Sequence, residues 1–114
     1  MLLRSFAALT FVSGIVTANA QTALPENDQA FRALVLQHAA LGSPINSTKV
    51  TAEGLGLACT WAKGREFWGL AEPTDYFYCS KISGSPVARR WQLALIPRGQ
   101  VLHDVRATFG LVGP

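Results

Sequence analysis

The sequence WQLALIPRGQVLHDVRATF, residues 91–109, contains the clearest pair of β-strands in the chain. Trp91–Ile96 and Val101–Phe109 are rich in the apolar, aromatic and β-branched residues that strands favour. The four residues between them, Pro97-Arg98-Gly99-Gln100, are typical of a hairpin connection. This segment is therefore predicted to form an antiparallel hairpin.

Further strands are predicted upstream of the hairpin. Residues 57–61 alternate, and Lys63-Gly64 offers a turn before a second run over residues 65–70. Residues 75–81 form a third run, which is rich in aromatic side chains and ends near Gly84 and Pro86. Together with the hairpin, these runs predict an antiparallel sheet of about three to five strands.

One or two helices are predicted before the sheet. Residues 25–41 place Phe31, Leu34, Val35 and His38 on one stripe, with Asn27 or Asp28 as cap and Gly42 and Pro44 as stop. Residues 47–54 have β-branched residues that favour a strand, but Ser47 and Gly54 are typical of helix ends, and we favour the helix. The predicted fold class is α+β, with one or two N-terminal helices packed on one face of the sheet.

Alternation along the strands sorts their side chains onto two faces. The face expected under the helices carries Leu57, Cys59, Trp61, Phe77, Cys79, Trp91, Leu93, Leu95, Val101, His103, Val105, Ala107 and Phe109. The opposite face is expected to carry Tyr76, Tyr78, Arg90, Gln92, Ile96, Leu102, Asp104 and Arg106. Aromatic and arginine side chains of this kind are enriched where proteins bind partners.

Residues 1–20 have the layout of a cleaved signal peptide. Arg4 precedes an apolar run over residues 6–16, and Ala18-Asn19-Ala20 supplies the small residues of a cleavage site. The apolar run is shorter than the roughly 20 residues that span a bilayer. Residues 21–114 are then expected to form a single periplasmic or secreted domain, without a lipid anchor because Gln21 offers no thiol.

The two cysteines, Cys59 and Cys79, are predicted to form a disulfide, the default state for an even pair in an exported chain. A bridge across a loop of this length stabilises the fold by about 3 kcal/mol. Structural zinc sites need more ligands at closer spacing, so no metal is expected.

Several chemistries have no support in the sequence. Lys and Arg number 10 against 7 Asp and Glu, and the basic residues are scattered, so nucleic-acid binding is not expected. We find no nucleophile elbow, phosphate-binding loop or cofactor motif. His103, a polar residue on a mostly apolar strand, is interpreted as a core or rim imidazole, with a pH switch, a ligand contact or a catalytic role as alternatives.

Phe67 and Trp68 are adjacent between glycines, and neighbouring strand residues cannot both face one core. One of them is therefore exposed, or the segment is not a strand. They form either a lid on the core or an anchor for a partner. The partner-binding candidates are Tyr76, Tyr78, Arg90, Arg106, Phe67 and Trp68.

A pattern of glycine, serine, valine, glycine and cysteine runs through Leu41-Gly42-Ser43-Pro44-Ile45, Val50 and residues 54–59. Cys79, Trp91 and residues 101–109 continue it. This pattern resembles small exported helix–helix–sheet modules: the small lipoprotein family of the outer-membrane β-barrel assembly machinery and the repeats of the β-lactamase inhibitor protein. The resemblance covers residues 41–109 and implies a two-helix, antiparallel-sheet fold without catalytic residues. The lipid-anchoring cysteine and the second inhibitor repeat are both missing.

The functional prediction is an exported, non-catalytic module that binds an unknown protein partner or has a structural role in the cell envelope. An inhibitor of a secreted or periplasmic hydrolase is the first alternative. A small enzyme that uses His103 is the second.

Overall fold

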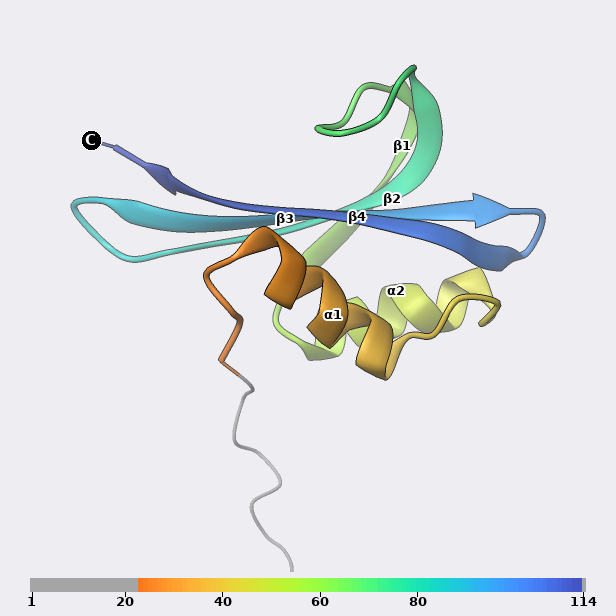
Figure 1. The fold of residues 1–114 in the computed structure, drawn as a ribbon, viewed down its shortest axis with the longest axis horizontal. Helices are drawn as coiled ribbons and strands as arrows, with labels where there is room; N and C mark the ends of the chain where they lie inside the picture. The colour runs from red at the N-terminus through yellow and green to blue at the C-terminus, as the bar shows by residue number, and fades with distance from the viewer. Residues whose placement is uncertain (1–22, 114) are drawn as a thin grey trace, which may run out of the picture.

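The computed structural model describes residues 23–113, so the predicted signal peptide lies outside the described residues. Two helices, α1 (Asp28–His38) and α2 (Ile45–Gly54), precede four strands, β1 (Ala58–Arg65), β2 (Thr74–Ser83), β3 (Ala88–Arg98) and β4 (Val101–Val112). Each strand pairs antiparallel with the next, in the order β1-β2-β3-β4. The predicted α+β class is therefore confirmed, with four strands in the antiparallel sheet. Figure 1 shows both helices on the same side of that sheet.

The first helix is shorter than predicted at both ends. The Asn27 side chain caps it by accepting a hydrogen bond from Ala30 N at 2.9 Å. The stripe of apolar residues is only partly buried: Phe31 and Val35 are buried, Leu34 is partly buried, and His38 is exposed at the last position. The helix ends there, several residues before Gly42, and the chain then turns towards the sheet.

The ambiguous segment over residues 47–54 is helical, as favoured, and α2 starts slightly earlier, at Ile45. Pro44 rather than Ser47 occupies the cap position, without a side-chain cap. Backbone hydrogen bonds from Ile45 N to Gln100 O and from Leu102 N to Ser43 O, both 2.8 Å, attach the start of α2 to the β3–β4 hairpin.

The main core lies between the helices and the sheet. Phe31 and Val35 of α1 belong to the same buried cluster as Leu93 and Leu95 of β3. Trp91 of β3 closes one end of this core, where its Nε1 donates to Pro25 O at 2.8 Å. Burial of large side chains of this kind contributes roughly 1.5–3 kcal/mol each.

The predicted faces of β4 are wrong at three positions, Val101, Leu102 and His103, because the strand contains a bulge. Ile96 pairs with Asp104 but Pro97 pairs with Leu102, so His103 has no partner across the strand. An extra residue of this kind reverses the alternation. Leu102 is therefore buried in the helix-side core, where His103 was expected, and Val101 and His103 are exposed.

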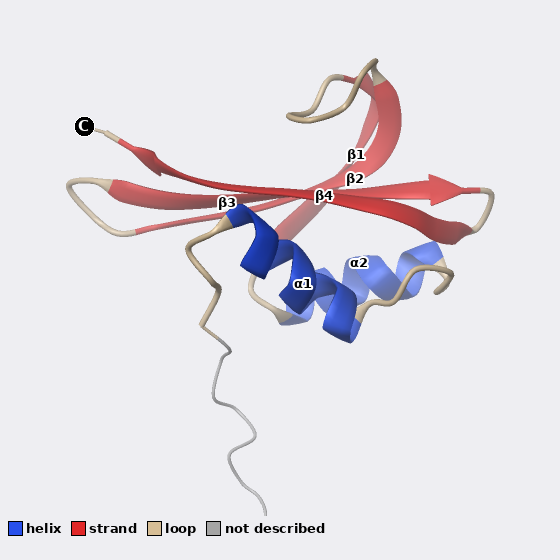
Figure 2. Cartoon of the chain, in the orientation of Figure 1, coloured by secondary structure: helices blue, strands red, loops and turns tan. Residues whose placement is uncertain are grey.

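The prediction for the β1–β2 connection is also wrong. Residues 65–70 do not form a strand. The β1–β2 register shifts between Ala62 and Arg65, and the chain leaves the sheet after Arg65. Both strands bend away from the helices at this end, and the loop that joins them turns back over the opposite face (Figure 2). Trp61 lies at the bend, against Phe77 but beyond the cover of the helices, and is 49 % exposed.

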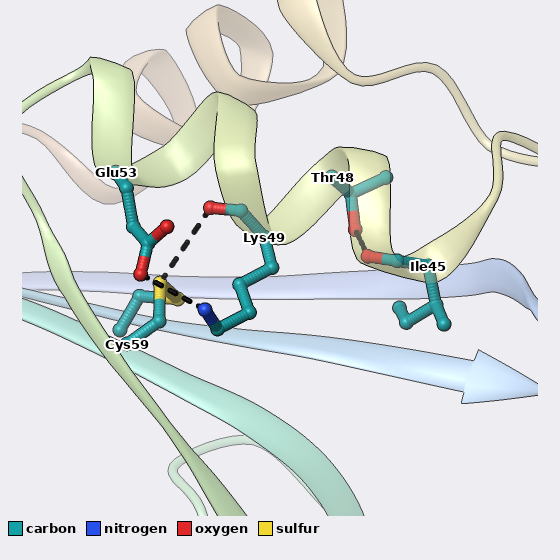
Figure 3. Close-up of a disulfide and its surroundings, with 6 residues drawn as sticks. Ile45, Thr48, Lys49, Glu53 and Cys59 are labelled. Atoms are coloured by element: carbon teal, nitrogen blue, oxygen red, sulfur yellow. Dashed lines mark hydrogen bonds and ion pairs between the residues drawn. A yellow bond between two sulfur atoms is a disulfide. The ribbon is translucent and has the colours of Figure 1, made fainter.

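The predicted disulfide between Cys59 and Cys79 is present and joins directly opposite residues of β1 and β2, with a Cα–Cα distance of 4.0 Å. Cys79 is fully buried and Cys59 partly buried. The side chains of Lys49 and Glu53 on α2 form an ion pair of 3.1 Å beside Cys59 (Figure 3). The bridge thus ties the outer strand to the centre of the sheet, under α2. Within residues 23–113, neither helix has the length and apolar character needed to cross a membrane.

Candidate functional site

The face of the sheet away from the helices has a small core of its own. Its buried members are Ala62, Tyr76, Ala94 and Ile96, and the partly buried Phe67, Leu70 and Tyr78 pack against them. Phe67 and Leu70 belong to residues 66–73, which we call the covering loop. This face is therefore not a uniformly exposed surface, as the alternation suggested, but one that is partly covered by the chain itself.

Three contacts hold the covering loop in place. The Tyr76 hydroxyl donates to Glu66 O at 2.8 Å, and the Phe67 ring packs edge-on against Tyr76 and Tyr78, with centroids 5.7 and 6.3 Å apart. Within the loop, Leu70 N donates to Phe67 O at 3.0 Å. Burial is the main effect that raises the pKa of Tyr76, against an opposing effect of Arg65.

Phe67 and Trp68 have opposite surroundings. Phe67 packs in the small core and is partly buried, whereas Trp68 is 74 % exposed. The next residue, Gly69, has φ +87°, a conformation that glycine adopts without strain. The lid and the candidate anchor are thus different residues of the pair. Phe67 closes the small core, and Trp68 is exposed to solvent.

Three hollows border Trp68. One, of about 510 Å³, is formed by the covering loop alone. The other two lie between the covering loop and other parts of the fold. The larger of these two, about 430 Å³, lies between the covering loop and β1, β2 and β3, and its lining includes Thr60, Phe67, Tyr78 and Gln92. Its volume is within the range of sites that hold small ligands or single side chains. Gln92 Nε2 donates to the Tyr78 hydroxyl at 2.8 Å, which orients both groups in this hollow.

The smaller hollow, about 190 Å³, lies where Trp68 and Gly69 approach β4 and α1. Arg32 and Arg106 contribute to its lining, and both donate to the carboxylate of Asp104, at 3.2 and 3.0 Å. Burial raises the pKa of Asp104, but hydrogen bonds from Val105 N, Arg32 and Arg106 outweigh it, and the pKa lies below its ordinary value. The carboxylate is therefore ionised at neutral pH and holds both guanidinium groups in place.

The structure brings five of the six predicted contact residues to this region. Phe67, Trp68, Tyr76 and Tyr78 line the larger hollow, and Arg106 lines the smaller one. Tyr76 is only 3 % exposed because the covering loop lies on it, so its role is to hold the loop. Arg90 lies elsewhere, paired with Ile82 and Gly110 towards the far end of β3.

The structure does not place His103, the residue of the alternative enzymatic role, in either of these two hollows. His103 and His38 are both exposed, and neither lines any of the three hollows beside Trp68. Among residues 23–113, no group of three or more His, Cys, Asp or Glu side chains is close enough together to hold a metal ion.

No protein-family model matches the chain, and neither curated protein sequences nor solved structures give a significant match.

The small core under the covering loop is the part of the site that sequence reasoning missed. Its signal is the run Leu93-Ala94-Leu95-Ile96, in which apolar residues occupy both faces of β3. An unbroken apolar run of this kind is typical of a strand that is buried on both sides. The helices can bury only one of those sides, so the other needed a second cover.

Proposed function

We propose that this chain is an exported, non-catalytic protein-binding module, and that its contact surface is the Trp68 side chain with the hollows beside it. The observation that carries the proposal is the exposure of Trp68, 74 %, on a loop whose neighbouring residues are held down. Tryptophan is among the residues that dominate binding energy at protein interfaces.

The surroundings of Trp68 support this assignment. The covering loop is anchored through Phe67 and the Tyr76–Glu66 hydrogen bond, so little conformational freedom remains to be lost on binding. The exposed guanidinium of Arg106 lies beside the loop, within 3.8 Å of where a side chain on Gly69 would begin. An aromatic anchor that is flanked by an arginine and borders several hollows is suited to a partner that inserts its own side chains around the indole.

Export is supported by the Cys59–Cys79 disulfide, because such bridges persist in oxidising compartments. The envelope-structural role implied by the resemblance and the hydrolase-inhibitor alternative both use this surface and differ in the partner. The identity of the protein held at Trp68 distinguishes them: an assembly component supports the first, and a hydrolase that loses activity in the complex supports the second.

The experiment is site-specific photocrosslinking in the cells that make the protein. A benzophenone amino acid at position 68 is compared with the same group at Ile82, which is 62 % exposed on the outer end of β2. We expect position 68 to give one predominant crosslinked protein, and position 82 not to give that adduct. Trp68→Ala should then abolish capture of that protein in a pull-down, with a change in the free energy of unfolding within about 1 kcal/mol. Equal adducts from both positions, or capture that survives Trp68→Ala, would contradict the proposal.

A further inference from the structure

We infer that the free edge of β1 is a homodimer interface, on which β1 of a second copy adds antiparallel to form one continuous sheet. This inference rests on the two sheet edges and does not require the proposed function, although Thr60 and Trp61 of this edge also line the larger hollow beside Trp68. The sheet order leaves β1 and β4 as the outer strands, each with backbone groups that face away from its neighbour. Unprotected groups of this kind are templates for another strand, so proteins block the edges that must stay free.

The edge of β4 is blocked by charged side chains. Val105 O accepts from Arg32 Nε at 2.7 Å, and Val105 N donates to Asp104 at 2.8 Å. Further along, Phe109 N donates to the Asp28 carboxylate at 2.7 Å. Arg32 and Asp28 both come from α1, which packs along β4. A strand from another chain would have to displace these bonds, so this edge is closed.

The edge of β1 has no such protection. Cys59 and Cys79 are a directly opposed pair whose Cα atoms are only 4.0 Å apart, the close spacing of a pair that is not hydrogen-bonded across the strands. The N–H and C=O groups of Cys59, and two residues later those of Trp61, therefore face outwards. Among the residues that the structure describes, no side chain hydrogen-bonds to the backbone of residues 58–63.

The sequence of β1 fits a second copy of itself. In the antiparallel register centred on Thr60, Cys59 of one copy faces Trp61 of the other, and their outward N–H and C=O groups exchange hydrogen bonds. Thr60 then faces Thr60 across the axis, a cross-strand pair that stabilises sheets. The half-exposed Trp61 side chain would be covered beside the disulfide of the second copy. This covering gives the exposed indole at the bend of β1 a packing partner.

The charges of β1 are compatible with the same register. Its basic residues, Lys63 and Arg65, lie at one end only, and the antiparallel arrangement places the two basic ends far apart. Each basic end instead approaches the start of the other β1, next to the C-terminal end of α2. That end carries the negative pole of the helix and the Glu53 carboxylate. Like charges are thus separated, and opposite charges are brought together twice by the symmetry.

Two pairs of variants test the interface. Trp61→Pro is compared with Trp61→Ala: both remove the indole, but only proline removes the outward N–H, and proline is tolerated at such edge positions. Analytical ultracentrifugation over a concentration series should show a monomer–dimer equilibrium in the wild type. We expect Trp61→Pro to have a dimer dissociation constant at least about tenfold above that of Trp61→Ala, because one hydrogen bond is lost per copy.

The second pair tests the register. Thr60→Cys should form a covalent dimer on mild oxidation, because the two residues meet at the axis, whereas Ala58→Cys on the same face should not. Peptide mapping checks that the Cys59–Cys79 bridge stays intact, and circular dichroism checks folding. A wild type that is monomeric at every concentration overturns the inference, as do equal dissociation constants for the two Trp61 variants. Equal crosslinking of Thr60→Cys and Ala58→Cys would also refute it.

Discussion

Loss of the Cys59–Cys79 bridge should destabilise the fold by an amount that follows from its position. The cysteines are 20 residues apart in the sequence, and closing a loop of that length removes unfolded-state entropy worth about 3 kcal/mol at 25 °C. For a domain of this size, each kcal/mol lowers Tm by about 4–8 °C, so the expected fall is about 12–24 °C. Cys59→Ala/Cys79→Ala should lose up to about 1 kcal/mol more, because Cys79 is fully buried and alanine leaves a gap.

The assay is urea unfolding followed by tryptophan fluorescence. Oxidised wild type, wild type with reductant and the double-alanine variant are compared under identical conditions. Reduction keeps both sulfur atoms in place and isolates the effect of the bond, whereas the variant adds the effect of truncation. If the unfolding free energies of reduced and oxidised wild type differ by less than about 1 kcal/mol, the entropic reasoning is refuted. The bridge would then add little to the stability that the sheet provides. Native protein with two free thiols would remove the support for export as well.

Two further predictions concern the face of the sheet away from the helices. Tyr76→Phe removes the hydrogen bond to Glu66 O and should lower the free energy of unfolding, measured by thermal unfolding, by about 1 kcal/mol. Amide exchange should become faster in the covering loop only. Unchanged exchange would show that the bond does not hold the loop. For Asp104, a folded-state pKa below the ordinary 3.8 means that the carboxylate contributes stability above that pH and loses it as pH falls through the folded value. The free energy of unfolding of the wild type should therefore exceed that of Asp104→Asn at pH 7, and this difference should become smaller in acid. A difference that stays constant from pH 7 to below the folded pKa would contradict the prediction.

The class of the fold was predictable because strong local signals agree with the global arrangement. The hairpin over residues 91–109 has a turn and two long apolar runs, and β3 and β4 extend it only at the ends. The disulfide was predicted from an even pair of cysteines in a chain with a signal-peptide layout, and the bridge in turn placed the two side chains on one face. The end of α1 was less predictable, because the chain leaves the helix at His38 to reach the β3–β4 hairpin, and that contact is tertiary.

The site was predictable in composition but not in arrangement. Alternation placed Tyr78 and Arg106 together with Asp104, and the structure adds that Asp104 fixes the arginine. It could not show the bulge at His103, because a bulge is decided by pairing with β3 and not by the residues of β4 alone. It also could not show that the covering loop returns to bury Tyr76, because this depends on the bend of β1 and β2.

The contact between α1 and β4 has a consequence for how the chain acquires its shape. The bonds from Arg32 to Val105 O and from Asp28 to Phe109 N join residues 73 and 81 positions apart, the first and last elements of the described fold. During synthesis, α1 emerges long before its docking strand exists, and its apolar stripe stays uncovered until nearly the whole domain has followed. Closure of the domain is therefore a late event, and a truncation that removes β4 deprives the earliest helix of its partner.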